Sequence, residues 1–151
     1  QTVNGEPLTL KTLGELVQEP REGYATRYRY LDLGQYTDPP APASHWALFR
    51  TGVIVKSVDQ NYSAQQQIVQ QYPGYVVPTI LDATVSILLK YLKTGTRLYK
   101  KKPWYPYTRC QEKYDQNCQL GVGGFEPDGL FVGNHCSDAL NLVGVAGLRK
   151  F

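Results

Sequence analysis

The 151-residue sequence contains no methionine and only two histidines. Translation begins with Met, so this absence predicts that the chain was cut from a longer precursor or is a fragment of one. Long apolar runs are also missing. The longest, residues 85–92, is interrupted by Ser86 and Lys90 and is too short to cross a bilayer. No signal-peptide run is visible, and we expect no membrane segment.

Cysteine is scarce, with three residues and no CxxC pair. We interpret them as reduced thiols of an intracellular assembly rather than a disulfide framework. Together with His135, they lack the close-paired spacing that prepares a zinc site. The stretch GVGG, residues 121–124, does not form a phosphate-binding glycine loop. The sequence therefore predicts no metal and no cofactor.

Charge is modest, with 19% charged residues and a formal net charge of +3. This balance permits a polyanionic partner without requiring one. The chain is rich instead in turn residues and tyrosine: 14 Gly, 10 Pro and 12 Tyr. Aromatic runs broken by turn residues are typical of many short strands. The length fits a single domain covering residues 1–151.

The periodicity of the N-terminal half predicts one short helix and two strands. Leucine and valine recur at helical spacing over residues 10–17, with Thr12 and Glu15 in a capping-box pattern, and Pro20 ends the helix. Residues 25–33 alternate as a strand. Residues 45–58 fit a strand with a bulge at Gly52. The Pro-rich residues 37–44 and the Gln-rich residues 59–71 are interpreted as loops.

The second half contains one ambiguous segment. In residues 79–94, Leu81, Val85, Leu88 and Leu92 fit a helix face, whereas Val85, Ile87, Leu89 and Tyr91 fit a strand face. The surrounding β-type segments favour the strand. Pro103 and Pro106 exclude a regular helix over residues 98–107. Residues 121–133 and 138–151 are predicted as late strands.

The order of four segments along the chain is informative: GEPLTLKTLGELVQEP at 5–20, HWALFRTGVIVKSV at 45–58, KKPWYPYTR at 101–109 and SDALNLVGVAGLRKF at 137–151. In this order they resemble the capsid proteins of picorna-like insect viruses, the dicistroviruses and iflaviruses. The resemblance implies an all-β fold, the cricket-paralysis type of jelly roll, which is an antiparallel β-sandwich. Because 151 residues are few for a complete barrel, it also implies that the chain is the C-terminal larger part of that domain.

The function implied by the resemblance is structural, and we expect no enzyme. The chain would be a capsid subunit of a small icosahedral positive-strand RNA virus, assembled in the host cytoplasm and located in the virion. Its partners would be other capsid chains, as homo- and hetero-oligomers, and the genomic RNA through non-specific contact. The expected interface or scaffold residues are Trp46, Phe49, Arg50, Trp104, Tyr105, Tyr107 and Arg109. The expected RNA contacts are Arg97, Lys100, Lys101 and Lys102.

Two other functions remain open. Basic and aromatic residues alternate over 97–109, a composition that suits a β-barrel binding single-stranded nucleic acid. A cysteine hydrolase would need Cys136 or Cys110 to meet His45. The adjacent His135 and Cys136 would point to opposite faces of an extended strand and so do not form a catalytic pair. We favour the structural role over both.

Overall fold

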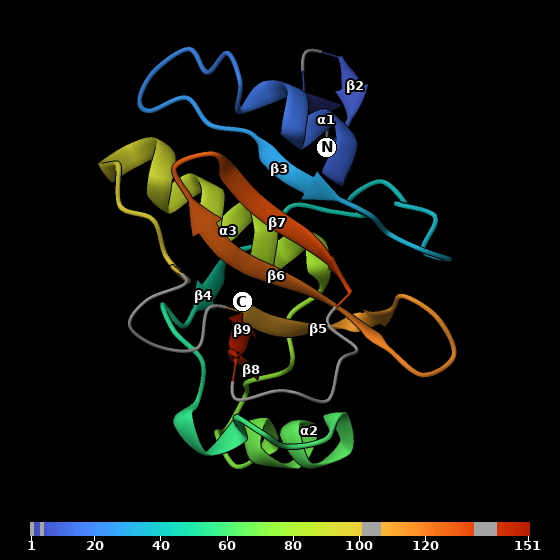
Figure 1. Cartoon of the computed structure of the whole chain (residues 1–151). Helices are drawn as coiled ribbons and strands as arrows, with labels where there is room; N and C mark the ends of the chain where they lie inside the picture. The colour runs from blue at the N-terminus through green and yellow to red at the C-terminus, as the bar shows by residue number, and fades with distance from the viewer. Residues whose placement is uncertain (1, 4, 101–106, 135–141) are drawn as a thin grey trace.

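A five-stranded mixed sheet lies at the centre of the computed structural model, which describes residues 2–3, 5–100, 107–134 and 142–151 (Figure 1). The strand order is β3-β7-β6-β5-β8. Strands β5, β6 and β7 are antiparallel neighbours, whereas β3 pairs with β7 and β5 pairs with β8 in parallel. The strands are β3 (Tyr28–Leu31), β5 (Tyr107–Lys113), β6 (Gln119–Glu126), β7 (Gly129–Asn134) and β8 (Val143–Gly144).

One face of this sheet is covered by the helix α3 (Ile80–Thr94) (Figure 1). The buried positions of α3 follow a spacing of three and four: Ile80, Ala83, Thr84, Ile87, Leu88 and Tyr91. The ring of Tyr91 lies 4.9 Å from that of Phe125 on β6. The main hydrophobic core therefore lies between α3 and the sheet.

The ends of α3 explain why residues 80–94 form a helix. The Thr79 hydroxyl accepts a hydrogen bond from the Asp82 backbone N–H at 3.1 Å and caps the N-terminus. At the C-terminus Gly95 adopts the left-handed conformation, with φ of 67°, and donates to the Tyr91 carbonyl. The predicted strand over 79–94 is wrong, since the buried residues follow the helical period.

The remaining elements lie around this centre. Figure 1 shows the hairpin of β1 (Thr2–Val3) and β2 (Glu6–Pro7) with α1 (Leu10–Leu16) at one end of the molecule. The helix α2 (Tyr62–Gln70) lies at the other end, beside the 3-10 helix η1 (Val55–Ser57). A separate two-stranded ribbon joins β4 (Ala47–Phe49) to β9 (Leu148–Lys150). No helix in the described part of the chain has the length and apolar character needed to span a membrane.

Two of the local predictions are confirmed. The short N-terminal helix is α1, although its capping box is formed by Thr9 and Thr12 rather than by Thr12 and Glu15. The alternating strand over 25–33 is β3. Of the two predicted late strands, 121–133 contains parts of β6 and β7 with a turn between them rather than one strand. The other, 138–151, is described from residue 142 and contains β8 and β9.

The predicted all-β jelly roll is wrong. Besides α3, the segment expected as a loop over 59–71 contains α2, which begins where the Asn61 side chain accepts from the Ala64 N–H at 2.9 Å. Of the predicted strand over 45–58, only the three residues of β4 form a strand, and η1 follows later in the same segment. The chain is a mixed α/β structure whose sheet contains parallel pairs, so the antiparallel sandwich is not formed.

Candidate interaction surface

The β4–β9 ribbon has one face toward the core and one toward solvent. Its register pairs Ala47 with Lys150, Leu48 with Arg149 and Phe49 with Leu148. Side chains alternate between the two faces of a strand, so Phe49 and Leu148 share a face. Leu148 is fully buried there, and Phe49 packs against Tyr99 with ring centroids 6.1 Å apart. Backbone hydrogen bonds of 2.8 and 2.9 Å to Val76 fix β9 on its other side.

The opposite face of the ribbon is apolar and exposed. Trp46 and Leu48 have exposed fractions of 84% and 53%, and Phe151, which follows β9, has 69%. The Phe151 N–H donates to the Trp46 carbonyl at 3.0 Å, which places the two residues opposite each other. The Arg149 guanidinium lies 5.0 Å from the centroid of the Phe151 ring. We call Trp46, Leu48, Arg149 and Phe151 the outer ribbon face.

A cluster of cations and tyrosines continues from this face. Arg50, directly after β4, lies with its guanidinium 5.6 Å from the Tyr72 ring centroid, and the Lys56 ammonium lies 5.9 Å from the same centroid. Tyr75 meets Tyr72 edge-on at 6.4 Å. A Cβ at Gly147 would approach Tyr75 to 2.8 Å, so a glycine there allows the tyrosine to lie against β9.

Between these groups lies an open groove with a volume of about 470 Å³. Arg50 and Tyr75 supply its polar and aromatic walls. The remaining lining residues are Leu48, Phe49, Thr51, Gly52 and Val53. None of these described lining residues carries a carboxylate.

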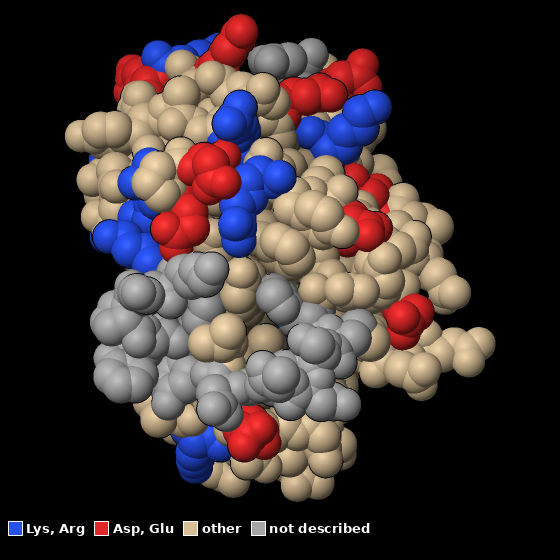
Figure 2. Space-filling view, in the orientation of Figure 1, with Lys and Arg blue, Asp and Glu red and all other residues tan. Residues whose placement is uncertain are grey.

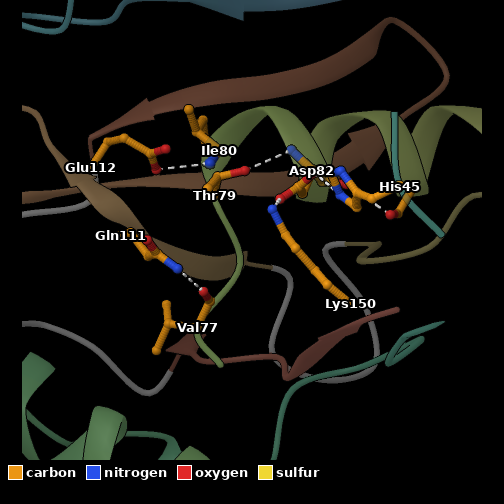
Figure 3. A network of polar contacts seen from close by, with 9 residues as sticks. His45, Val77, Thr79, Ile80, Asp82, Gln111, Glu112 and Lys150 are labelled. Atoms are coloured by element: carbon orange, nitrogen blue, oxygen red, sulfur yellow. Dashed lines mark hydrogen bonds and ion pairs between the residues drawn. The ribbon is translucent and has the colours of Figure 1, made fainter. Parts of the chain in front are cut away.

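Behind the ribbon a polar network ties it to the start of α3 (Figure 3). The Asp82 carboxylate contacts Lys150 Nζ at 2.8 Å and His45 Nε2 at 3.0 Å. Burial alone would raise the pKa of Asp82, but the hydrogen bonds from Lys150 and Thr79 and the charges of Lys150 and His45 outweigh it and lower the pKa. An ionised Asp82 therefore holds both strands of the ribbon against the helix.

A second carboxylate supports the same helix end. Glu112 Oε2 accepts from the Ile80 N–H at 2.8 Å, and the neighbouring Gln111 side chain donates to the Val77 carbonyl (Figure 3). Burial raises the pKa of Glu112, and the hydrogen bond from Ile80 only partly opposes this. Figure 3 shows Glu112 and Lys150 pointing toward the first turn of α3, from β5 and β9, while Gln111 points to Val77.

Three of the predicted interface residues meet in one place. Trp46, Phe49 and Arg50 all belong to the ribbon, with Trp46 and Arg50 exposed and Phe49 packed inward. The other predictions lie elsewhere. Tyr107 is buried on β5, and Arg109 donates to the Gln60 carbonyl at 2.9 Å and to Gln65 Oε1 at 3.3 Å. Trp104 and Tyr105 lie outside the described residues.

Of the four predicted RNA contacts, Arg97 and Lys100 lie among the described residues. Arg97 lies over the rings of Tyr91 and Phe125, at 4.9 and 5.8 Å, and its Nη2 donates to the Tyr91 hydroxyl at 3.1 Å. The Arg97 side chain therefore makes its contacts within the folded chain. Lys100 is exposed, and Lys101 and Lys102 lie outside the described residues.

The cysteine hypothesis loses one candidate. Cys110 is fully buried, and burial, followed by the charges of Glu112 and Asp82, raises the pKa of its thiol well above the ordinary value. A reactive cysteine needs a lowered pKa and access to solvent. Cys118 is disulfide-bonded, so the prediction of reduced thiols is wrong for this residue. His135 and Cys136 lie outside the described residues. Across the described ranges no cluster of His, Cys, Asp and Glu could hold a metal ion.

The residues that sequence reasoning missed are Lys56, Tyr72, Tyr75, Asp82, Arg149 and Lys150. Tyr72 and Tyr75 flank the turn at Pro73-Gly74, and Thr79 with Asp82 has the pattern of a helix start. Both signals are visible in the sequence, whereas the approach of Arg50 and Lys56 to the Tyr72 ring is not. Comparison with known proteins adds nothing to these observations, because no protein-family model, curated protein or solved structure matches the chain.

Proposed function

We propose that the chain is a structural subunit that assembles with further copies of itself through the outer ribbon face. The observation that carries the proposal is the exposed side chains of Trp46, Leu48 and Phe151 beside Arg149. Tryptophan and arginine are the residues most enriched among those that dominate binding energy in protein interfaces, and aromatic residues are enriched there in general. Exposed apolar side chains that adjoin each other favour burial against a partner.

Burial of this face contributes a favourable free energy to self-association. Burying one large apolar side chain contributes about 1.5–3 kcal/mol, so three of them contribute several kcal/mol before the cost of association. The strand edge adds to this. The backbone N–H and C=O groups of alternate residues, Trp46, Leu48 and Arg50, face β9. The backbone N–H and C=O groups of Ala47 and Phe49 therefore point to the opposite side, away from β9. Among the described residues no strand pairs with that edge. A second copy could supply the missing hydrogen bonds.

The assembly we propose is a virus capsid. The support for this specific form is the order of the four sequence segments that resemble picorna-like capsid proteins, the second and fourth of which contain β4 and β9. The mixed α/β fold means that the proposal does not rest on a jelly roll. Under it the subunit has no catalytic reaction, assembles in the host cytoplasm and resides in the virion, with other capsid chains as further partners.

The test is the association of Trp46→Lys compared with Leu89→Lys, a matched control at another exposed apolar position, on α3. We expect the unchanged chain to form oligomers in sedimentation equilibrium and particles in negative-stain micrographs. Trp46→Lys should weaken self-association at least about tenfold, since burial of one such side chain is worth more than about 1.4 kcal/mol. Leu89→Lys should leave it unchanged. A chain that stays monomeric at its highest soluble concentration, or equal weakening by both variants, would contradict the proposal.

A further inference from the structure

Among the described residues, the lining of the groove beside β4 contains Arg50 and no Asp or Glu. The three segments that surround it, residues 46–58, 71–78 and 142–151, contain no Asp or Glu. They contain four cations. Lys150 pairs with Asp82, whereas Arg50, Lys56 and Arg149 form no ion pair with any described residue. Other surfaces differ. Figure 2 shows blue and red side chains interleaved over the upper part of the molecule, where opposite charges offset each other.

The cations are held in place by aromatic rings rather than by carboxylates. Arg50 and Lys56 both lie over the Tyr72 ring, and Lys56 Nζ also donates to Gln71 Oε1 at 2.5 Å. The Arg149 side chain approaches the turn at Gly74, where a Cβ would lie 3.2 Å from its Nε. A cation positioned by a ring keeps its charge available to an anion, whereas one paired with a carboxylate is largely neutralised.

The groove also offers a surface for a flat ring. Tyr75 forms one wall, half-buried, and Gly52 leaves open space, since a Cβ there would meet no atom within 4 Å. A volume of about 470 Å³ is sufficient for a base and its sugar. The arrangement thus combines a ring for stacking, a cavity beside it with Arg50 in its lining, and Lys56 over the neighbouring Tyr72 ring.

We propose that this groove binds single-stranded nucleic acid, one nucleotide unit seated against Tyr75 with the flanking phosphates on Arg50 and Lys56. Stacking platforms beside a positive groove are how proteins hold single strands without sequence preference. A duplex hides the faces of its bases, and an acidic peptide would engage the cations but leave the ring unused. The proposal goes beyond the assembly role and does not depend on it. The residues that carry it, Arg50, Lys56 and Tyr75, differ from the predicted RNA contacts at 97 and 100–102.

The experiment measures fluorescence anisotropy of labelled oligouridylate of about ten nucleotides, within the usual site size for such grooves. The protein is the full chain carrying Trp46→Lys, which lies outside the groove lining and weakens self-association, so that binding is read separately from assembly. We expect binding that falls steeply with salt. Replacing Arg50 and Lys56 by Ala should reduce the slope of log K against log salt by about 0.7 for each phosphate that the protein no longer neutralises.

The matched control replaces Lys90 and Lys93, two exposed lysines of α3, by Ala. It removes the same charge from another surface and should leave binding nearly unchanged. Tyr75→Ala should weaken binding roughly tenfold by removing the stacking ring, and Tyr75→Phe should restore it. Thermal unfolding of each variant checks that the fold is kept.

Three results would overturn the proposal. One is absence of binding by the chain at low salt. Another is equal weakening by the α3 control, which would indicate a diffuse charge effect. The third is displacement of the oligonucleotide by polyglutamate as effectively as by unlabelled oligouridylate, together with no effect of Tyr75→Ala, which would indicate a site for acidic peptides. Failure of the assembly proposal would appear in sedimentation alone, and failure of this one in anisotropy alone.

Discussion

Asp82 and Glu112, the two carboxylates at the start of α3, have pKa values displaced in opposite directions. Both are removed from solvent, and burial is the largest single influence on each. Asp82 faces Lys150 and His45, which favour its ionised form, and its pKa is lowered. Glu112 has backbone donors but no adjacent cation among its hydrogen-bond partners, and its pKa is raised. Partner charge therefore decides the direction.

The raised pKa of Glu112 predicts a pH-dependent effect of Glu112→Gln on stability. A carboxyl group whose folded pKa lies above its unfolded value binds more protons in the folded state, so its stabilising contribution is lost as pH rises from about 4.5 through the folded pKa. The Gln side chain keeps an oxygen that can accept from Ile80. We therefore expect the free energy of unfolding of the variant, relative to the unchanged chain, to increase over that pH range.

Urea unfolding at a series of pH values measures this difference. Glu15→Gln, at an exposed position of α1, controls for the general effect of removing one negative charge. A difference that is constant across pH, or that decreases as pH rises, would show that Glu112 is not held in a protonation-favouring environment.

At the scale of elements, the N-cap of α3 connects the helix to the ribbon. Thr79 caps the helix through the Asp82 N–H, and the Asp82 side chain then holds Lys150 of β9. The same first turn also receives Glu112 from β5. Two strands, β9 and β5, are thus attached at the position where this helix begins, and we expect loss of the cap to weaken both attachments.

Thr79→Ala should lower the free energy of unfolding by about 1 kcal/mol, the usual cost of losing an N-cap side chain. Thr79→Ser keeps the hydroxyl and should lose much less. Denaturant unfolding of the two variants measures the difference. Equal losses would mean that the methyl group of Thr79, rather than the capping hydrogen bond, provides the stabilisation.

At the scale of the whole molecule, the buried side chains form two clusters of unequal size. The larger cluster lies between α1, α3 and the sheet and includes Ile87, Leu88 and Phe125. The smaller one, beside α2, consists of Ile54, Val69, Val77 and Val145. Figure 1 shows α2 at the end of the molecule remote from α1. A small cluster at one end is expected to open without unfolding the rest.

Native-state hydrogen exchange of two core variants tests this division. Val69→Ala should speed exchange of α2 amides while those of α3 and β6 change little. Ile87→Ala should cost about 2–5 kcal/mol and speed exchange in every element that opens by global unfolding. If Val69→Ala accelerates α2 and α3 equally, the two clusters open together and the separation is wrong.

Secondary structure could be predicted from the sequence where the spacing of apolar residues fits only one type of element. The leucines of α1 have one amphipathic spacing and are followed by Pro20, so the helix could be predicted from the sequence. The alternating residues of β3 are equally unambiguous. Trp46, Phe49 and Arg50 are neighbours along the chain, and their grouping survives folding.

Only the tertiary structure decided the rest. Apolar residues in 80–94 satisfy both a helical and a strand period, and packing of Ile80, Ile87 and Tyr91 against the sheet selects the helix. The groove forms because Tyr75 approaches Arg50 from a turn more than twenty residues along the chain and meets β9 from the far terminus. Hydrogen bonding within a helix or along an alternating strand is dictated by neighbours, whereas contacts between distant segments depend on which buried faces fit together. These contacts therefore cannot be predicted from any single segment of the sequence.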